Sequence, residues 1–582
     1  MKTINKFKKM SVCLIALTLA GISCKDDFLE VPPTGSLSNA QLATKQGIDG
    51  ALIGAYSALN GVFGNRGEAP NLWEWGSIPG GDANKGTDPG DYSSINPIQR
   101  YEMNALDGDN NALWRGRYEG ISRCNAVLNL LAQATDVNPA DAKEISAEAR
   151  MLRGHFYFDL KKQYNSIPYI DETVPAADIA SIPNTPDVWD KIDADFQYAY
   201  DNLPATQDQA GRVNKWAAAA YMGKSKLYQH KYAEAKTWFD NVIANGVTTN
   251  GMKYDLNKNY VDIYNAENDN NTPEVVMDVE SANNTGSTQN ANYFDDLNYP
   301  YNTGLDGPGN CCGFFQPSFE LANSFRVGAD GLPMLDGSYN DPSNELKTDY
   351  NVESSDPFTP DAGLLDPRID FSIGRRGIPY LDWIPHPGKA WIRKQDYAGP
   401  YSPKKYVYYK SQENTFTDGS SWTRGYAIMN YTIIRFADVL LMAAEAEIEA
   451  GSLTKAMEYV NRVRARAADS QYWVKNDDGT DAANYKIEPY PASQFATKAS
   501  ATAAVRFERK LELSSEGFRF YDLVRWGIAD SVLNAYLQHE GKILVTMFGG
   551  AKFTAGKNEY YPIPQQQIDI QGSDVLTQNP GY

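Results

Sequence analysis

The most unusual string in the sequence is a pair of adjacent cysteines, Cys311 and Cys312, followed by a glycine and two phenylalanines. Neighbouring Cα atoms lie about 3.8 Å apart across a trans peptide and about 2.9 Å apart across a cis one, below the usual disulfide range of about 4.4–6.8 Å. Closing a disulfide here therefore gives a tight, rigid turn with an exposed sulfur face. We expect that face to stack against a ring of the ligand; the alternative is two reduced, buried cysteines.

Aromatic residues beside loop signals form a second group of candidates. Trp73 and Trp75 lie just before the Gly- and Asp-rich loop that holds Asp82, and Tyr101 follows in a polar stretch that predicts an exposed side chain. Residues two apart on a strand face opposite ways, so we expect at most one of the tryptophans to point outward. Flat rings of this kind can pack on the apolar faces of a ligand, each contact worth about 0.5–1.5 kcal/mol beyond its buried area. The alternative for each tryptophan is core packing.

A third group lies further along the chain. Arg375 sits in a Gly-flanked pair of arginines, a setting that suits planar hydrogen bonding to hydroxyls or carboxylates. Trp383 and Trp391 are candidate aromatic platforms for the same ligand. Arg368 is expected to pair with an internal acid instead, and His386, between two prolines, to be a structural turn residue.

Motifs for catalysis are missing from the sequence. It contains no His-Glu-x-x-His and no Cys-x-x-Cys, and Gly223-Lys224-Ser225 has Ala218 where a phosphate-binding loop needs glycine. Asp82, Asp88 and Asp91 have the carboxylates that suit Ca²⁺, although solvated loop charge is the simpler interpretation. We expect no catalytic residue, no cofactor and no dedicated metal site, while counting acids does not exclude a glycosidase-like pair.

The composition argues against a nucleic-acid-binding protein. The 582 residues include 54 Lys and Arg against 73 Asp and Glu, a formal net charge of −19, whereas phosphate binding needs clustered cations. Tyrosine is abundant, with 37 residues, and histidine is scarce, with 4. This balance favours a neutral ligand held by ring faces and hydroxyl hydrogen bonds.

The N-terminus predicts export. Residues 1–23 hold four lysines near the start, no acid, and an apolar stretch too short for a spanning helix. Gly21-Ile22-Ser23-Cys24 resembles the lipobox of bacterial lipoproteins, with Gly21 in place of the usual aliphatic residue. We expect lipidation of Cys24 and a mature chain of residues 24–582; the alternative is an ordinary secretion signal. Lys25-Asp26-Asp27 resembles the export signal for the outer face of the outer membrane.

Hydrophobic periodicity predicts a scaffold of repeated helix pairs, one beginning near Val213 and another near Ile433. Their second helices match at an offset of 221 residues, with Ala235, Phe239 and Val242 corresponding to Ala456, Val460 and Val463. Small residues where helices cross closely are typical of tetratricopeptide-like repeats. Further helices are expected at 40–60, 109–134, 140–164, 186–202 and 501–515.

A loop-rich insertion interrupts this scaffold. Residues 291–430 hold 13 of the 31 prolines and 23 aromatic residues, and no helical stripe persists there. We therefore expect helical scaffold at about 36–254 and 428–582, and a loop-rich insertion at about 255–427 that carries the ligand face, because long loops on a rigid scaffold commonly hold binding residues.

Separated motifs in these segments resemble the SusD/RagB family. They are Ala147-Glu148-Ala149-Arg150-Met151-Leu152-Arg153, Arg435-Phe436-Ala437-Asp438, Glu508-Arg509-Lys510-Leu511-Glu512-Leu513, Asp522-Leu523-Val524-Arg525-Trp526-Gly527 and the closing Tyr561-Pro562-Ile563-Pro564 with Gln578-Asn579-Pro580-Gly581-Tyr582. The resemblance runs from the lipobox to the last residue. These motifs belong to the scaffold, so they identify the family without locating the ligand.

The resemblance implies a mainly α-helical fold on tetratricopeptide-like helix pairs, forming a single domain over residues 24–582. It also implies a surface-exposed outer-membrane lipoprotein that binds a glycan and caps a SusC-like TonB-dependent transporter as a lid. A homologue that captures peptides or another nutrient is the alternative within the family. A surface glycosidase is the alternative from another class.

Overall fold

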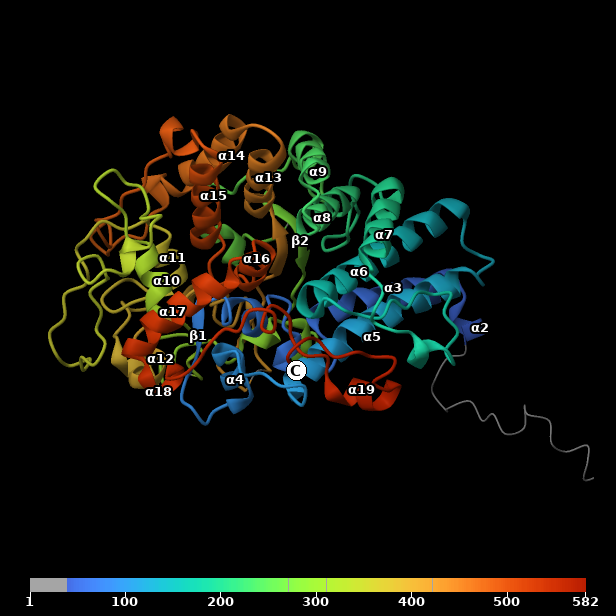
Figure 1. Ribbon diagram of the computed structural model, residues 1–582, viewed down its shortest axis with the longest axis horizontal. Helices are drawn as coiled ribbons and strands as arrows, with labels where there is room; N and C mark the ends of the chain where they lie inside the picture. The colour runs from blue at the N-terminus through green and yellow to red at the C-terminus, as the bar shows by residue number, and fades with distance from the viewer. Residues whose placement is uncertain (1–38, 271, 310, 421) are drawn as a thin grey trace, which may run out of the picture.

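The computed structural model describes residues 39–582 apart from positions 271, 310 and 421 (Figure 1). The expected signal segment 1–23 and Cys24 lie outside the described residues. No helix in the described part of the chain is long and apolar enough to cross a membrane.

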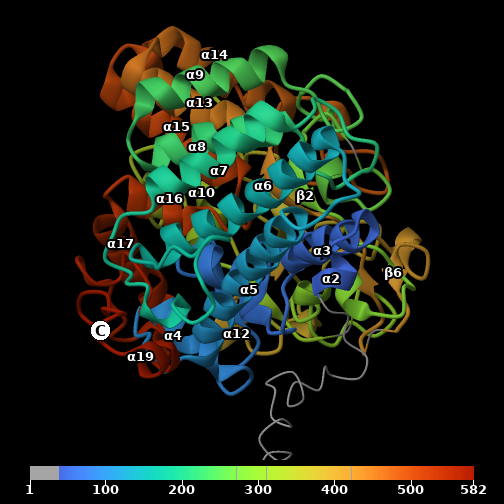
Figure 2. The ribbon, with the colours of Figure 1, turned by 90° about the vertical axis from the view of Figure 1, so that its right-hand side faces the viewer.

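Helices from both ends of the sequence form one continuous row (Figures 1 and 2). The N-terminal members are α3 (Lys45–Ser57), α5 (Gly108–Leu131), α6 (Pro139–Tyr164), α7 (Trp189–Asn202), α8 (Lys215–Tyr228) and α9 (Tyr232–Asn245). The C-terminal members are α13 (Phe436–Ala450), α14 (Leu453–Ala467) and α15 (Lys498–Glu512). Each packs on the next, and α9 packs directly on α13 although some 190 residues separate them. The row confirms the predicted helical scaffold.

The two predicted helix pairs are α8–α9 and α13–α14, and their crossings use the expected small residues. A Cβ atom on Gly223 of α8 would lie 2.5 Å from the Phe239 ring of α9, so only glycine lets the ring approach. Ala235 and its counterpart Ala456 are fully buried. The Asn214 side chain begins α8 by accepting hydrogen bonds from two backbone N–H groups, which explains the sharp start of this helix.

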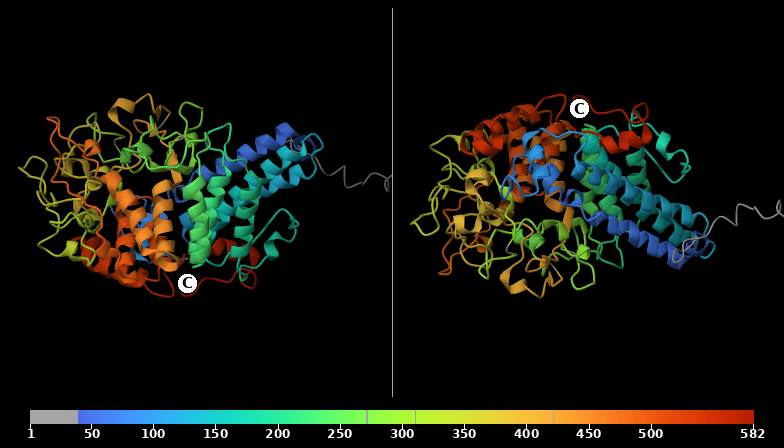
Figure 3. Two further views of the ribbon diagram at one scale, coloured as in Figure 1. Left: turned by 90° about the horizontal axis from the view of Figure 1, so that it is seen from above. Right: turned by 90° about the horizontal axis from the view of Figure 1, so that it is seen from below.

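The remaining helices have seven residues or fewer, apart from α17 with 15. They are α2 (Asn39–Leu42), α4 (Asn96–Arg100), α10 (Phe319–Ser324), α11 (Ile369–Ser372), α12 (Gln395–Ala398), α16 (Arg519–Arg525), α17 (Ala529–Ile543), α18 (Val545–Phe548) and α19 (Gln565–Gln571). The later, yellow part of the insertion gathers at the end of the molecule opposite α3 and α5, whereas its first part, with β2 (Val275–Val279), lies beside α3 (Figure 3).

Short antiparallel strand pairs attach the insertion to the scaffold. In the first, β1 (Ala83–Gly86) pairs with β3 (Phe314–Pro317), and in the second, β2 (Val275–Val279) pairs with β8 (Tyr431–Arg435) just before α13. Two minimal pairs lie within the insertion: β4 (Ile373–Gly374) with β5 (Ser402–Pro403), and β6 (Thr417–Asp418) with β7 (Tyr426–Ala427). Strand β1, from the N-terminal third of the chain, therefore pairs with the strand that follows the adjacent cysteines.

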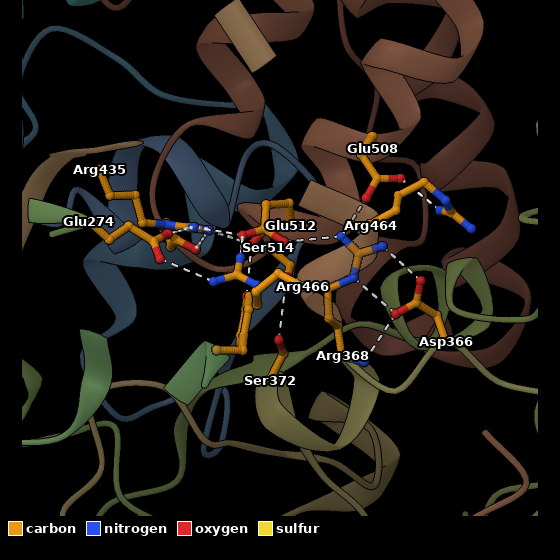
Figure 4. Close-up of polar contacts among 12 residues, drawn as sticks. Glu274, Asp366, Arg368, Ser372, Arg435, Arg464, Arg466, Glu508, Glu512 and Ser514 are labelled. Atoms are coloured by element: carbon orange, nitrogen blue, oxygen red, sulfur yellow. Dashed lines mark hydrogen bonds and ion pairs between the residues drawn. The ribbon is translucent and has the colours of Figure 1, made fainter. Parts of the chain in front are cut away.

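A buried ion network forms the third attachment (Figure 4). Arg368, which precedes α11, donates to Asp366 and reaches Glu508 at 2.6 Å and Glu512 at 3.1 Å, both on α15. Glu512 also forms ion pairs with Arg435, at 2.6 Å, and with Arg466. Arg368 and the two glutamates have no exposed surface. Arg368 thus pairs with internal acids as predicted, and the charged motif around Glu508 holds the insertion on the scaffold.

Candidate functional site

Trp73 and Trp75 lie in the core. They belong to a short π-helical turn, η4 (Trp73–Ser77), so the expectation that they alternate as on a strand is wrong. Neither side chain has exposed surface. The Trp75 indole donates to the Gly67 carbonyl at 2.7 Å, and Trp73 packs against Phe315 with ring centres 5.6 Å apart. Both tryptophans therefore follow the core-packing alternative, and neither offers a face to a ligand.

Tyr101 is also buried, contrary to the expectation of an exposed ring. Its side chain is 7% exposed, its hydroxyl donates to the Pro79 carbonyl at 2.7 Å, and its ring meets Phe553 edge-on. Phe553 comes from the C-terminal region, more than 400 residues away. The burial comes from a partner that local polarity does not reveal.

The acids of the proposed Ca²⁺ cluster do not gather. Asp82 is buried beside Ser515, whose backbone N–H donates to it at 3.0 Å, and burial raises the pKa of Asp82 to about 7. Asp88 and Asp91 instead pair with Arg393, at 2.8 and 2.5 Å. No group of three or more His, Cys, Asp or Glu within the described ranges is arranged to hold a metal ion.

Arg375 and the two later tryptophans form the support beneath the insertion's surface. Asp370 binds the Nε and Nη2 atoms of Arg375 at 2.6 and 2.7 Å, and the arginine is only 5% exposed, so it presents little surface to a ligand. Trp383 donates to the Tyr408 carbonyl at 3.1 Å, and Trp391 is 3% exposed. These three predicted ligand-binding residues shape the loops without facing solvent.

His386 is the structural turn residue that its two flanking prolines predict. Its Nδ1 accepts a hydrogen bond from the Gly388 N–H at 3.0 Å, and its Nε2 lies 2.9 Å from the Ser402 hydroxyl. Burial lowers the pKa of His386 to about 3, so it stays neutral at physiological pH.

Cys311 and Cys312 are joined by a disulfide, the first of the two alternatives that the sequence left open. Cys311 is half-buried, whereas Cys312 is 6% exposed. The Cys312 N–H donates to the Leu297 carbonyl at 3.0 Å, and the next residue's N–H donates to the Tyr299 carbonyl at 2.8 Å. Because β3 follows at once and pairs with β1, the turn is anchored on both sides.

An exposed tryptophan lies on the segment next to this turn. Trp422 is 57% exposed, and its indole Nε1 donates to Oδ2 of Asp296 at 2.7 Å. Asp296 precedes Leu297, the residue whose carbonyl receives the Cys312 N–H. Arg66 also grips Asp296, at 2.7 and 2.9 Å, and so fixes the acceptor that orients the indole.

Tyr301 also lies beside the disulfide turn. A Cβ atom on Gly313 would lie 3.3 Å from the Tyr301 Cβ atom, which places this tyrosine beside the disulfide turn. The Arg393 guanidinium lies 5.3 Å from the centre of the half-buried Tyr301 ring. We call Arg66, Asp296, Tyr301, Cys311, Cys312 and Trp422 together the disulfide face, in which the buried Asp296 and Cys312 support the more exposed side chains of the others.

Each arginine at or beside the disulfide face is paired with acids. Arg66 pairs with Asp296, and the neighbouring Arg393 pairs with Asp88 and Asp91. Such a surface presents an indole, a phenol ring and a disulfide, together with hydrogen-bonding groups that carry little net charge. It suits an uncharged ligand with both C–H faces and hydroxyl groups.

Beyond the cysteines, the sequence carries only a weak signal for this surface. Trp422 stands in a stretch of Gly, Ser and Thr, which is typical of a surface loop, but its composition does not separate it from the buried Trp383. Arg66 and Asp296 lie 230 residues apart, and no local pattern links them.

Comparison with known proteins places this fold in a family. Residues 273–582 match the model of the SusD family, and residues 27–229 match a SusD-like family described as starch-binding and associating with the outer membrane. The chain belongs to the SusD family. Its relatives include SusD-like protein P2 of Formosa agariphila, 26% identical over 99% of this chain and 100% of that protein. A SusD-like protein of Bacteroides ovatus is 24% identical over 99% of this chain and 96% of its own.

Solved SusD structures share the whole fold. A SusD superfamily protein from Bacteroides vulgatus has a TM-score of 0.65 at 19% identity and covers 94% of this chain and 99% of its own. A laminarin-binding SusD-like protein scores 0.63 at 22% identity, covering 93% and 100%. Surface glycan-binding protein A from Bacteroides thetaiotaomicron, in complex with laminarihexaose, scores 0.63 at 21% identity, covering 92% and 99%. These likenesses confirm the predicted SusD fold.

Proposed function

We propose that this SusD-family protein binds a glycan at the disulfide face. The observation that carries the proposal is the exposed indole of Trp422, held by Asp296 beside the Cys311–Cys312 turn. A pyranose ring has apolar C–H faces that pack on aromatic rings, and its hydroxyls use the surrounding donors and acceptors. The glycan-binding names of two SusD-like proteins of the same fold support this ligand class.

Because the arginines at the disulfide face are already paired with acids, the face favours a neutral glycan over a sulfated or uronic one. An anionic sugar would have to compete with Asp296 for Arg66, or with Asp88 and Asp91 for Arg393. Breaking these pairs costs hydrogen bonds that the anion only replaces, so it gains little. A neutral sugar leaves them in place.

We further propose that the protein works as a lipid-anchored lid at the cell surface. Cys24 carries the anchor, the outer membrane holds it, and a SusC-like TonB-dependent transporter receives the captured glycan. The lipobox-like segment and the outer-membrane description of the matching SusD-like family support this arrangement. The protein binds without chemistry in this scheme, since no candidate residue forms a catalytic pair on the disulfide face.

Calorimetry and affinity electrophoresis against a panel of polysaccharides, with laminarin among them, test the binding proposal. The mature chain carrying Cys24→Ala should bind at least one neutral glycan with micromolar-to-millimolar affinity. Trp422→Ala should weaken that binding at least tenfold. Trp238→Ala, on the scaffold helix α9, is the matched control and should leave it unchanged.

Four results would overturn parts of the proposal. Binding of peptides alone would replace the glycan with the peptide alternative, and release of shorter sugars would make the protein a glycosidase. Equal binding by the Trp422→Ala chain would remove the disulfide face as the site. Membrane attachment of the Cys24→Ala chain in cells without a transporter partner would contradict the lipid anchor.

A further inference from the structure

A cavity of about 520 Å³ opens between α3 and β2, and none of its lining residues belongs to the disulfide face. Its volume falls within the range of about 300–1,000 Å³ typical of small-molecule sites. Ile53 and Tyr56 of α3 form one wall, and the loop at Gly211 forms another. Asp278 and Glu280, at the end of β2, lie across from them. A Cβ atom on Gly211 would lie 2.5 Å from the Glu280 Cγ atom, so glycine lets this loop close over the acid.

Three carboxylates meet around one asparagine at the β2 side of the cavity. The Asn430 side-chain amide donates to Asp278 at 3.2 Å and to Glu280 at 3.0 Å, and its backbone N–H donates to Asp269 at 2.7 Å. Asp278 is 6% exposed. Within the described part of the chain, no Lys, Arg or His forms an ion pair with any of the three acids.

The arginines that line the cavity are already engaged elsewhere. Arg212 donates to both oxygens of Glu148, at 3.0 and 3.1 Å, and Arg123 pairs with Glu119 at 2.9 Å. A further acceptor stands free, because Oδ1 of Asn60, another lining residue, is buried and receives no hydrogen bond. The cavity therefore holds an excess of acceptors, and its own cations do not satisfy them.

A buried carboxylate needs either a cation or a proton. Burial, with the nearby Glu280 and Asp269 charges adding to it, raises the pKa of Asp278 well above its usual range. Burial also raises the pKa of Glu280, and the pKa of Asp269 rises to about 7. These raised pKa values favour a proton on the acid cluster near neutral pH. A ligand cation would replace that proton.

We propose that this cavity binds the primary ammonium group of a small polar ligand between Asp278 and Glu280. An ammonium carries three donors and no acceptor, which matches the excess of acceptors. The compact group also fits beside two acids that share a single amide donor. The remainder of the ligand lies along Tyr56 and the polar side chains of the other walls. This site is separate from the disulfide face and does not depend on glycan binding there.

Binding of the ammonium releases a proton. The amine enters as its cation, the protonated carboxyl of the acid cluster gives up one proton to the buffer, and the carboxylate remains paired with the ligand. Because the ligand fixes the ionised form of the acid, its affinity rises with pH until the free cluster is itself ionised.

The test uses a matched pair of six-membered rings, trans-4-aminocyclohexanol and trans-1,4-cyclohexanediol, titrated calorimetrically into the mature Cys24→Ala chain at neutral pH. The amine stays protonated there because aliphatic amines titrate near 10. It should bind at least tenfold more tightly than the diol. Its apparent enthalpy should differ between phosphate and HEPES buffers, which reports the released proton.

Variants then locate the site. Asp278→Asn combined with Glu280→Gln keeps the shape and should lower the affinity for the amine at least tenfold, while Asp255→Asn, an exposed acid paired with Arg462, should leave it unchanged. Equal binding of amine and diol, binding of neither, or full affinity in the double variant would each overturn the proposal. Should the double variant fail to fold, the amine–diol comparison on the parent chain still decides.

Discussion

The indole Nε1 of Trp422 lies 2.7 Å from Oδ2 of Asp296. The exposed tryptophan of the disulfide face is therefore held by a carboxylate that has no exposed surface of its own. Arg66 binds the same carboxylate in a two-pronged contact. The indole is therefore oriented before any ligand arrives. A ring that is already fixed loses little conformational freedom on binding.

Changing Asp296 should weaken glycan binding without removing the ring that contacts the sugar. Asp296→Asn keeps the size of the side chain but loses the charge that Arg66 grips, so the indole becomes less well held. We expect a loss of about three- to tenfold in affinity, smaller than that of Trp422→Ala. Affinity electrophoresis on the preferred polysaccharide measures both. An Asp296→Asn chain that binds like the parent would show that the indole needs no such support.

The disulfide turn should contribute to affinity as an apolar platform. Cys311→Ser combined with Cys312→Ser leaves a polar, more mobile turn in its place, and we expect glycan affinity to fall by about tenfold. Calorimetry measures the loss, with Cys124→Ser as the control for general cysteine replacement, since Cys124 is buried away from the face.

Intact-mass measurement establishes the bond itself. The denatured Cys24→Ala mature chain should take up one alkyl label, at Cys124, before reduction and three afterwards. Three labels without reductant would contradict the disulfide.

Trp75 and Trp422 should respond to alanine in opposite ways. Trp75→Ala removes a fully buried ring and its hydrogen bond to Gly67, and should lower the free energy of unfolding by about 3–5 kcal/mol. Trp422→Ala removes a mostly exposed ring and should change it by less than about 0.5 kcal/mol. Denaturant unfolding followed by circular dichroism distinguishes the two. A folded Trp75→Ala chain of parental stability that failed to bind glycan would return this tryptophan to the binding site.

Glu512 should be a major determinant of acid stability. Burial raises its pKa, but Arg466, Arg435 and Arg368 outweigh that effect and hold the pKa well below its usual range. A carboxyl of this kind stabilises the fold above its unfolded pKa of about 4.3, and the contribution fades as the pH falls below that value.

Glu512→Gln should lower the free energy of unfolding by about 3–5 kcal/mol near neutral pH, because it removes a buried carboxylate that offsets the charges of Arg368, Arg435 and Arg466. The deficit should shrink as the pH falls, since the parent loses its own advantage there. Thermal melts across an acid pH series measure this. A constant deficit across the series would separate the ion network from acid stability.

Asp82 should have the opposite pH dependence. Burial raises its folded pKa to about 7, so its contribution to stability is complete below the unfolded pKa and is lost as the pH rises through about 7. Asp82→Asn cannot ionise and still offers an oxygen to the Ser515 N–H. The variant should exceed the parent by up to about 4 kcal/mol in alkaline solution. Melting temperatures that run parallel from acid to alkaline pH would contradict the raised pKa.

Local patterns predicted the scaffold and failed where distant contacts decide burial. The stripe Ala235, Phe239 and Val242 and its repeat identified two helix pairs, because helical packing repeats over a few residues. The adjacent cysteines drew attention to a possible tight turn, but their spacing left the disulfide and a reduced, buried pair both open. Tyr101 was misjudged because Phe553, distant in sequence, covers its ring.

Two tryptophans of the insertion show the same limit. Trp383 and Trp422 both stand in loops rich in turn residues, yet the first is buried beneath Tyr408 and Arg424 and the second is open. Residue type and spacing locate the loops that hold a binding face. Which ring turns outward depends on long-range packing that only the folded chain establishes.

The buried ion network around Arg368 separates the demands of folding from those of recognition. It clamps the insertion through buried side chains, whereas Trp422 bonds to Asp296 and Tyr301 contacts Arg393, neither of which belongs to the network. The loops of Tyr301 and Trp422 are thus free to vary in length and sequence while the clamp keeps its place. Exchanging these loops between SusD relatives should transfer the ligand preference of the donor protein, and the recipient protein should still fold.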